Sequence, residues 1–329
     1  MKRSYFSKIL LALLVTLIFL FLLYRLQKIS LRELLSLFAG ASTRLLFLGF
    51  VVMLTANLVR SLRFHFLLGR HGYLKTLFAS NNVYNLATAT FPGGLGEIFS
   101  VFIFQRYNGI NTGTAFSLIV LSRLFDLLSL CLIIMVALKY CSCSLAKLLA
   151  LASLGFGTLS LLLLIPPINR TLVGLLNRFL PPYSFLNKIK DFLSQVEGAL
   201  SYVHNAREWF FLLLLSFVMT SLNILSLLVL LQAIGINISF AACSISFGIY
   251  AILQLLPVHG IGGVGTQEAW WTLGLTSVGV PKEVAIPVSF FLHGMFYLYI
   301  LVIAVFLGFP LLKKTETKEA TADGILFPK

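Results

Sequence analysis

Residues 91–97 read Phe-Pro-Gly-Gly-Leu-Gly-Glu, and residues 262–268 read Gly-Gly-Val-Gly-Thr-Gln-Glu. Each of these glycine-rich loops interrupts a long apolar run and ends on an acid. A charged side chain at bilayer depth costs about 2.5–3.5 kcal/mol on insertion scales, so two acids at corresponding places favour a functional role. Broken helices in matching halves of a membrane protein are typical of a transporter's binding site. The two loops therefore predict where a binding site lies.

The composition of the chain is that of a membrane protein. Its 329 residues are 59% hydrophobic and 11% charged, whereas a soluble protein carries about 25% charged residues. The mean hydropathy is +0.96, and apolar runs of about 20 residues, the length that crosses a bilayer, recur throughout. We predict an all-α, polytopic membrane protein with about six full transmembrane helices and two broken or re-entrant helical hairpins in an inverted repeat.

The apolar runs divide into full spans and shorter pairs. One short run stands on each side of each glycine-rich loop, which predicts two hairpins whose freed backbone groups must bind neighbouring helices. The predicted hairpin helices are Leu74–Phe91, Glu97–Ile110, Phe240–Leu256 and Thr266–Val278. The predicted full spans are Lys8–Leu26, Thr43–Leu68, Gly113–Leu138, Leu145–Ile165, Trp209–Ala233 and Glu283–Phe309.

We expect a single integral membrane domain over residues 1–329. The repeat is indicated by the two loops and by Arg123 and His293, which recur about 170 residues apart. Few side chains are identical between the two halves, so the alternative is that the matching positions arise by coincidence. The expected divisions are an N-terminal anchor helix and loop (1–40), a first repeat (41–140), a connecting helix and amphipathic linker (141–208), a second repeat (209–309) and a cytoplasmic tail (310–329).

The linker between the repeats carries an apolar stripe with steps of three and four residues. Such a stripe predicts an amphipathic helix that rests on the cytoplasmic interface of the membrane. The residues of the stripe are Leu186, Ile189, Leu193, Val196, Leu200 and Val203.

The chain carries 25 Lys and Arg against 11 Asp and Glu, a net charge of +14. In a soluble protein this excess would suggest nucleic acid, but here it lies in short loops beside the spans, where anionic lipid attracts it. Basic loops at 60–75 and 170–207 and a basic tail predict cytoplasmic N- and C-termini in the inner or plasma membrane of the cell. The basic residues between 25 and 44 oppose this orientation.

The loops offer two kinds of binding group. Glycines at the start of a short helix expose backbone N–H groups that favour an anion, or they serve only tight helix packing. Glu97 and Glu268 would bind a cation or a proton at depth, or would stabilise the helix dipole. The candidate substrate-binding residues at the loops are Pro92, Gly93, Gly94, Gly96, Glu97, His259, Gly262, Gly263, Gly265 and Glu268.

Further candidates lie on the helices. Arg60 and Arg63 end a long helix, where they would anchor among headgroups or line the inner mouth of an anion path. Arg123 and Asp126 are three residues apart, so they can pair within one helix, and that arginine suits a phosphate. These candidates are Arg60, Arg63, Asn85, Arg123, Asp126 and His293.

No catalytic motif stands out in the sequence. Residues 260–265 match the G-x-G-x-x-G pattern but follow an apolar helix rather than a strand, which argues against dinucleotide binding. Walker, zinc-ligand and Gly-x-Ser-x-Gly patterns do not occur. We therefore expect no enzymatic activity, no cofactor and no metal. An embedded enzyme that uses the two acids and the histidines is the least favoured reading.

The combined motifs resemble the lysylphosphatidylglycerol synthase transmembrane-region family of flippase-like membrane proteins. The resemblance rests on the basic turn at Arg60–Arg63, the Pro92–Glu97 loop, the Arg-x-x-Asp helix at Arg123–Asp126 and the Gly262–Glu268 loop. It implies lipid translocation or the handling of lipid-linked glycans. Three positions depart from the family pattern, because Ser100, Ser122 and His293 stand where charged residues are usual.

These observations favour a passive or ion-coupled translocase. The substrate would be an anionic phospholipid or a polyprenyl-phosphate-linked glycan precursor, with its headgroup held between the two loops. The alternative is a non-transporting membrane partner that serves a glycosyltransferase or a lipid-modifying enzyme.

Overall fold

The structure, a computed structural model, describes residues 31–68, 73–91, 95–166, 168–171, 174, 196–198, 200, 203, 205–256 and 260–313. Within these residues the chain is helical and contains no strand, which confirms the predicted all-α class. The predicted first span, Lys8–Leu26, and most of the tail lie outside the described residues.

The helices begin and end within a few residues of the predicted boundaries. The elements are α2 (Leu31–Gly40), α3 (Thr43–Leu67), α4 (Leu74–Thr90), α5 (Leu95–Asn108), α6 (Thr112–Ala137), α7 (Ala146–Leu164), α10 (Ala206–Ala233), α11 (Phe240–Leu253), the 3₁₀ turn η1 (Ile261–Gly263), α12 (Thr266–Ser277), α13 (Lys282–Ile303) and the π-helical turn η2 (Ala304–Gly308).

Local side chains explain where several helices start. The Asn111 side chain accepts the N–H of Thr114 at 2.7 Å, and the Ser239 hydroxyl accepts the N–H of Ala242 at 3.1 Å, so α6 and α11 both begin at a side-chain cap. Helix α2 occupies a stretch that we predicted as loop. It forms there because its apolar side packs on α13, with Phe38 and Phe291 ring centroids 5.0 Å apart.

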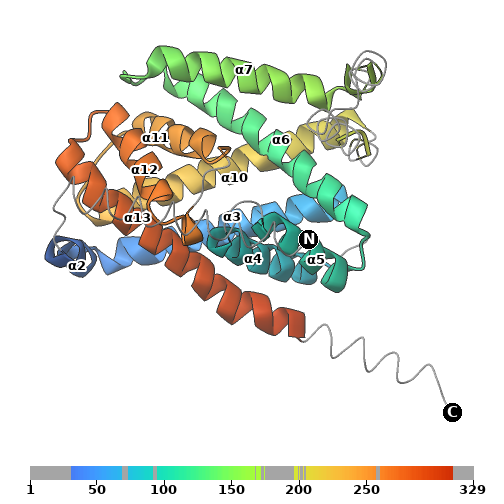
Figure 1. Ribbon diagram of the computed structural model, residues 1–329, viewed down its shortest axis with the longest axis horizontal. Helices are drawn as coiled ribbons and strands as arrows, with labels where there is room; N and C mark the ends of the chain where they lie inside the picture. Colours follow the sequence, from blue (N-terminus) through green and yellow to red (C-terminus); the bar gives the residue numbers. More distant parts are fainter. Residues whose placement is uncertain are drawn as a thin grey trace, which may run out of the picture.

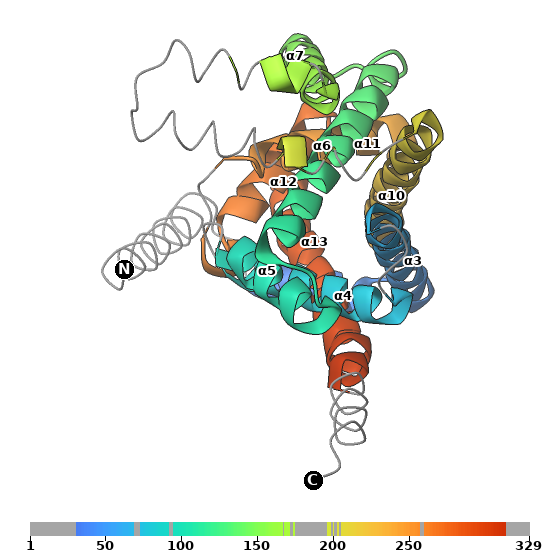
Figure 2. The same cartoon turned by 90° about the vertical axis from the view of Figure 1, so that its right-hand side faces the viewer.

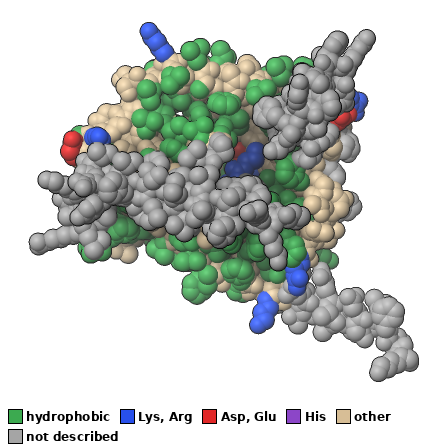
Figure 3. Space-filling model, viewed as in Figure 1, with side chains coloured by type: hydrophobic (Ala, Val, Ile, Leu, Met, Phe, Trp, Pro, Cys, Tyr) green, Lys and Arg blue, Asp and Glu red, His purple; other side chains and the backbone are tan. Residues whose placement is uncertain are grey.

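In the described part of the chain, five helices are long and apolar enough to cross a membrane. They are α3, α6, α7, α10 and the continuous helical stretch Lys282–Lys313. These five match five of the six predicted full spans, so the protein is a polytopic integral membrane protein. Where Figure 3 colours the described residues, hydrophobic side chains cover much of the face, and one group of Lys or Arg side chains is recessed near its middle.

The two halves of the chain pack on each other reciprocally. Helices α3 and α10, the first long helices of the predicted repeats, lie side by side (Figures 1 and 2). The hairpin helix α4 packs on α13 and η2, and its counterpart α11 packs on α6. Each hairpin thus rests on the last long helix of the other half, as two related repeats require. Their antiparallel sense in the membrane stays a prediction.

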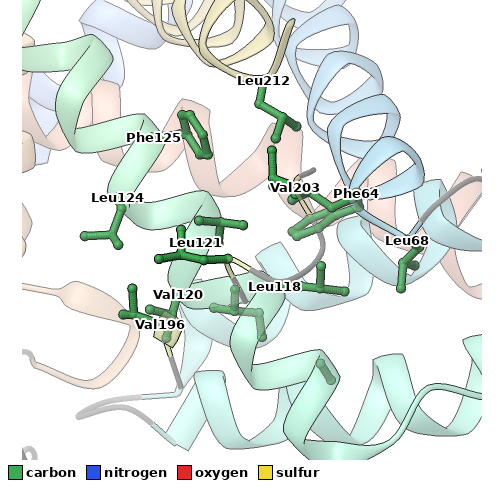
Figure 4. Packing of buried hydrophobic residues seen from close by; sticks show 14 of the residues in the cluster. Phe64, Leu68, Leu118, Val120, Leu121, Leu124, Phe125, Val196, Val203 and Leu212 are labelled. Atoms are coloured by element: carbon green, nitrogen blue, oxygen red, sulfur yellow. The ribbon is translucent and has the colours of Figure 1, made fainter. Parts of the chain in front are cut away.

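The described end of the linker is buried, in contrast to the predicted position on the membrane interface. Val196, Leu200 and Val203 are 0%, 4% and 7% exposed and pack in a cluster with Leu121 and Phe125 of α6 (Figure 4). These apolar side chains pack against the apolar face of α6, so they are buried within the protein and not in lipid. Leu186, Ile189 and Leu193 lie outside the described residues.

Glycine lets the second hairpin close tightly. A Cβ at Gly274 of α12 would lie 2.6 Å from the backbone oxygen of Ser246 on α11. We therefore expect Gly274→Ala to destabilise the protein by about 1–3 kcal/mol, because a backbone atom cannot move aside as a side chain can. Thermal unfolding in detergent measures this loss.

Gly155→Ala is the matched control, because a Cβ there meets nothing within 4 Å. It should be neutral, or stabilising by up to about 1 kcal/mol, since alanine is the better helix former. Equal melting temperatures for the two variants would contradict the tight contact between α11 and α12.

Candidate functional site

Arg63 on α3 ties three helices together. Its side chain is 1% exposed and forms a two-point ion pair with Asp126 on α6, in which Nη1 bonds Oδ1 and Nη2 bonds Oδ2 at 3.1 Å. Nη1 also donates to Ser216 Oγ on α10 at 2.6 Å. The planar guanidinium suits this geometry better than a lysine would. Arg63 is therefore enclosed between helices, which differs from an anchor among lipid headgroups.

A second guanidinium lies one turn earlier on α3. Arg60 Nη1 donates to Asn85 Oδ1 on α4 at 2.7 Å, and its Nε lies 3.3 Å from Met219 Sδ on α10. Asn85 in turn donates to Asn57 Oδ1 at 3.0 Å. The amides position the arginine without neutralising its charge.

The third guanidinium belongs to Arg123 on α6. Its Nη2 donates to the hydroxyl of Tyr84 on α4 at 2.9 Å. We considered a pair between Arg123 and Asp126 within α6, but both carboxylate oxygens of Asp126 bind Arg63 instead. Arg63 reaches this carboxylate from a different helix, which spacing within α6 could not reveal.

These groups enclose a small polar cavity, and we call the three arginines around it the guanidinium cluster. The cavity has a volume of about 20 Å³, which holds roughly one water-sized group. Among the described residues that line it are three guanidinium groups and one carboxylate, a lining with an excess of positive charge. Its lining residues are Arg60, Arg63, Phe64, Tyr84, Ile119, Ser122, Arg123 and Asp126.

An apolar cavity of about 300 Å³ lies between α6, α7 and the start of α10. It shares two helices with the guanidinium cluster, because Phe125 precedes Asp126 on α6 and Leu213 lies one turn before Ser216 on α10. The hydrocarbon-lined cavity and the cationic cavity thus both have lining residues on α6. The apolar cavity is lined by Phe125, Leu128, Leu161, Leu164, Ile165, Pro166, Trp209, Phe210 and Leu213.

The second glycine-rich loop has a backbone that requires glycine. Gly262, Gly263 and Gly265 have φ values of +61°, +74° and +84°, in the left-handed region. The N–H of Gly265 donates to Glu268 Oε2 at 2.7 Å, so this carboxylate caps its own helix. The chain itself occupies that donor, and a substrate role for the loop stays a prediction.

Glu268 also pairs with His293 of α13. Glu268 Oε1 and His293 Nδ1 are 2.7 Å apart, and the two side chains are 3% and 10% exposed. The structure therefore joins two sequence candidates that come from different helices. This pair is separate from the guanidinium cluster.

The first loop is described only in part. Gly96 is buried on α5, where a Cβ would collide with the backbone at Thr88 of α4, so it permits close packing of the first hairpin. The backbone of Glu97 is helical, while its side chain is outside the description. The other candidates outside the described residues are Pro92, Gly93, Gly94 and His259.

Sequence reasoning missed three residues of the polar site. Asn57 could have been recognised from the sequence, because it is an amide in an apolar helix one turn before Arg60. Ser216 and Met219 could not, because a serine or a methionine in a membrane helix is unremarkable. Only the packing of α10 against α3 brings them to the arginines.

The Arg63–Asp126 pair should contribute strongly to stability. Asp126→Asn leaves a buried guanidinium without its counter-charge, and we expect a loss of about 3–5 kcal/mol in thermal unfolding. The matched control is Glu197→Gln, which breaks the pair between Arg170 Nε and Glu197 at 3.0 Å. Those side chains are 71% and 37% exposed, so the change should stay within about 1 kcal/mol. If the two variants have the same melting temperature, the buried pair has no structural role.

Comparison with known proteins places the chain in a family. No curated protein and no solved structure matches it. The family model described as the lysylphosphatidylglycerol synthase TM region matches residues 9–304, which is most of the chain. The protein therefore belongs to the lysylphosphatidylglycerol synthase transmembrane-region family.

Proposed function

We propose that the protein moves an anionic lipid across the membrane and binds its headgroup at the guanidinium cluster. The observation that carries the proposal is the ratio of three guanidinium groups to one carboxylate around an enclosed cavity. The substrate is an anionic phospholipid or a lipid-linked glycan precursor with a phosphate. The proposal includes no chemical reaction, cofactor or metal.

The energetic argument starts from the cost of the cations. Arg60, Arg63 and Arg123 lie in helices long enough to span a membrane, where an arginine costs about 2.5–3.5 kcal/mol or more. Asp126 forms a two-point ion pair with Arg63. An anion that enters the cavity adds negative charge beside the guanidinium groups, which match phosphate oxygens in two-point geometry.

The neighbouring apolar cavity supports an amphipathic substrate. A lipid presents a charged headgroup and hydrocarbon chains, and α6 carries lining residues for both kinds of group. The polar cavity holds about one water-sized group as it stands, so a phosphate requires the helices around it to separate. The structure then corresponds to a closed state in the proposed cycle.

Removing the Arg60 or the Arg123 guanidinium from the cluster should weaken anion selectivity. We expect Arg60→Gln and Arg123→Gln to slow the movement of phosphatidylglycerol at least about tenfold, since a charge-assisted bond contributes roughly 1.5–3 kcal/mol. The measurement follows fluorescent phosphatidylglycerol and phosphatidylcholine across reconstituted vesicles. Lys139→Gln, an exposed cation in the turn after α6, is the charge-matched control and should change neither rate.

Two results would contradict the proposal. Wild-type protein that moves neither anionic phospholipid nor a polyprenyl-phosphate lipid faster than empty vesicles would exclude a translocase. A membrane partner for a glycosyltransferase would then be favoured, provided that the protein co-purifies with such an enzyme. Equal loss of transport for both phospholipids in the arginine variants would show that the cluster does not select the headgroup.

Filling the apolar cavity tests the proposed site for the hydrocarbon chain. Leu213→Trp adds a bulky ring to the cavity wall and should slow phosphatidylglycerol movement by about fivefold or more, because a filled cavity cannot accept an acyl chain. Leu214→Trp is the control, since Leu214 is exposed on the same helix and does not line the cavity. Similar rates for the two variants would exclude the cavity from the transport path.

A further inference from the structure

The Glu268–His293 pair is buried and does not line the cavity of the guanidinium cluster. Both oxygens of Glu268 are engaged, Oε2 by the Gly265 N–H at 2.7 Å and Oε1 by His293 Nδ1 at 2.7 Å. Among the described residues, no Lys or Arg lies within ion-pairing distance of this carboxylate. The imidazole is therefore the group that can neutralise it.

The charge of the pair depends on one proton. With a neutral imidazole the pair has a net negative charge inside the protein, and with an imidazolium it is neutral. The proton adds to the imidazole, and no other bond forms or breaks.

Among the described side chains, those packed around the pair add no competing charge at neutral pH. Helix α11 presents Tyr250, which interacts electrostatically with Glu268. Along α13, Tyr297 and Tyr299 bind Thr90 Oγ1 and the Leu46 carbonyl. Lys282 and Glu283 are exposed at the start of α13, away from the buried pair.

Helix α13 links the pair to the guanidinium cluster. Tyr297 lies one turn after His293, on the same side of the helix, and its hydroxyl is 3.1 Å from Thr90 Oγ1 on α4. The same α4 presents Tyr84 to Arg123 and Asn85 to Arg60. A displacement of α13 relative to α4 therefore changes the surroundings of two of the three arginines.

His293 occupies the place in the second repeat that Arg123 occupies in the first. Arginine keeps its proton in proteins, whereas histidine exchanges one near neutral pH. At this place the second half therefore carries a side chain that can bind and release a proton, whereas the first half carries one that cannot. Pro287 and the π-helical turn η2 also interrupt regular hydrogen bonding in the long helical stretch that includes His293, and such interruptions permit bending.

We infer that the Glu268–His293 pair is a proton-binding site that couples movement of the anionic lipid headgroup to a proton gradient. The coupling rests on the proposed function, whereas proton binding by the pair does not. A proton at His293 neutralises the pair, and α13 transmits the change to α4 and to the guanidinium cluster.

The coupling is tested in phosphatidylcholine vesicles that hold the full-length protein and a trace of fluorescent phosphatidylglycerol. An imposed pH difference should change the initial rate of wild-type lipid movement by about fivefold or more. His293→Arg keeps a cation beside Glu268 but cannot release its proton, so its rate should not respond to the pH difference. Glu268→Gln should lose the response as well. A response that persists in His293→Arg overturns the inference, and so does a wild-type rate that ignores the pH difference.

Proton uptake gives a readout that needs no lipid movement. When the detergent-solubilised protein is titrated from about pH 9 to 5, the wild type should take up about one more proton than His293→Arg does. Superimposable titration curves overturn the proton site even if lipid transport is normal. Conversely, a difference of one proton in a protein that moves no lipid rejects the proposed function and the coupling but retains the proton site.

Discussion

The enclosed guanidinium of Arg63 constrains the whole arrangement of long helices. A cation removed from water needs a carboxylate at hydrogen-bond distance and further acceptors for its remaining donors. Asp126 and Ser216 supply acceptors for Nη1 and Nη2 from α6 and α10, and these bonds fix the positions of α3, α6 and α10 relative to one another. Apolar packing alone would tolerate small sliding of helix on helix, whereas a two-point ion pair specifies one register.

The same constraint explains why the polar site lies where it does. With Asp126 committed to Arg63, the nearby Arg60 and Arg123 bind neutral amide and phenol groups. Among the described residues, three guanidinium groups and one carboxylate line the cavity, and this is the basis of the proposed anion site. One set of side chains thus joins the helices and forms the proposed site.

The two halves share an architecture but not a chemistry. Each hairpin packs on the last long helix of the opposite half. The first half concentrates arginines, while the second places a self-capping Glu268 beside His293. The proposed anion site thus belongs to the first half and the proposed proton site to the second, and the packing of α4 on α13 is one of the contacts between the halves.

The sequence by itself determined the class of protein, the bounds of its helices and most of the polar residues. Apolar length and glycine-rich breaks are local properties, so α3–α7 and α10–α13 could be placed within a few residues. The tertiary structure decided the partners: Asp126 binds Arg63 and not Arg123, Glu268 binds His293, and Val196 is buried against α6. These partners come from different elements of the chain, so no local pattern encodes them. They depend on which helices become neighbours, and the packing of the whole bundle decides that.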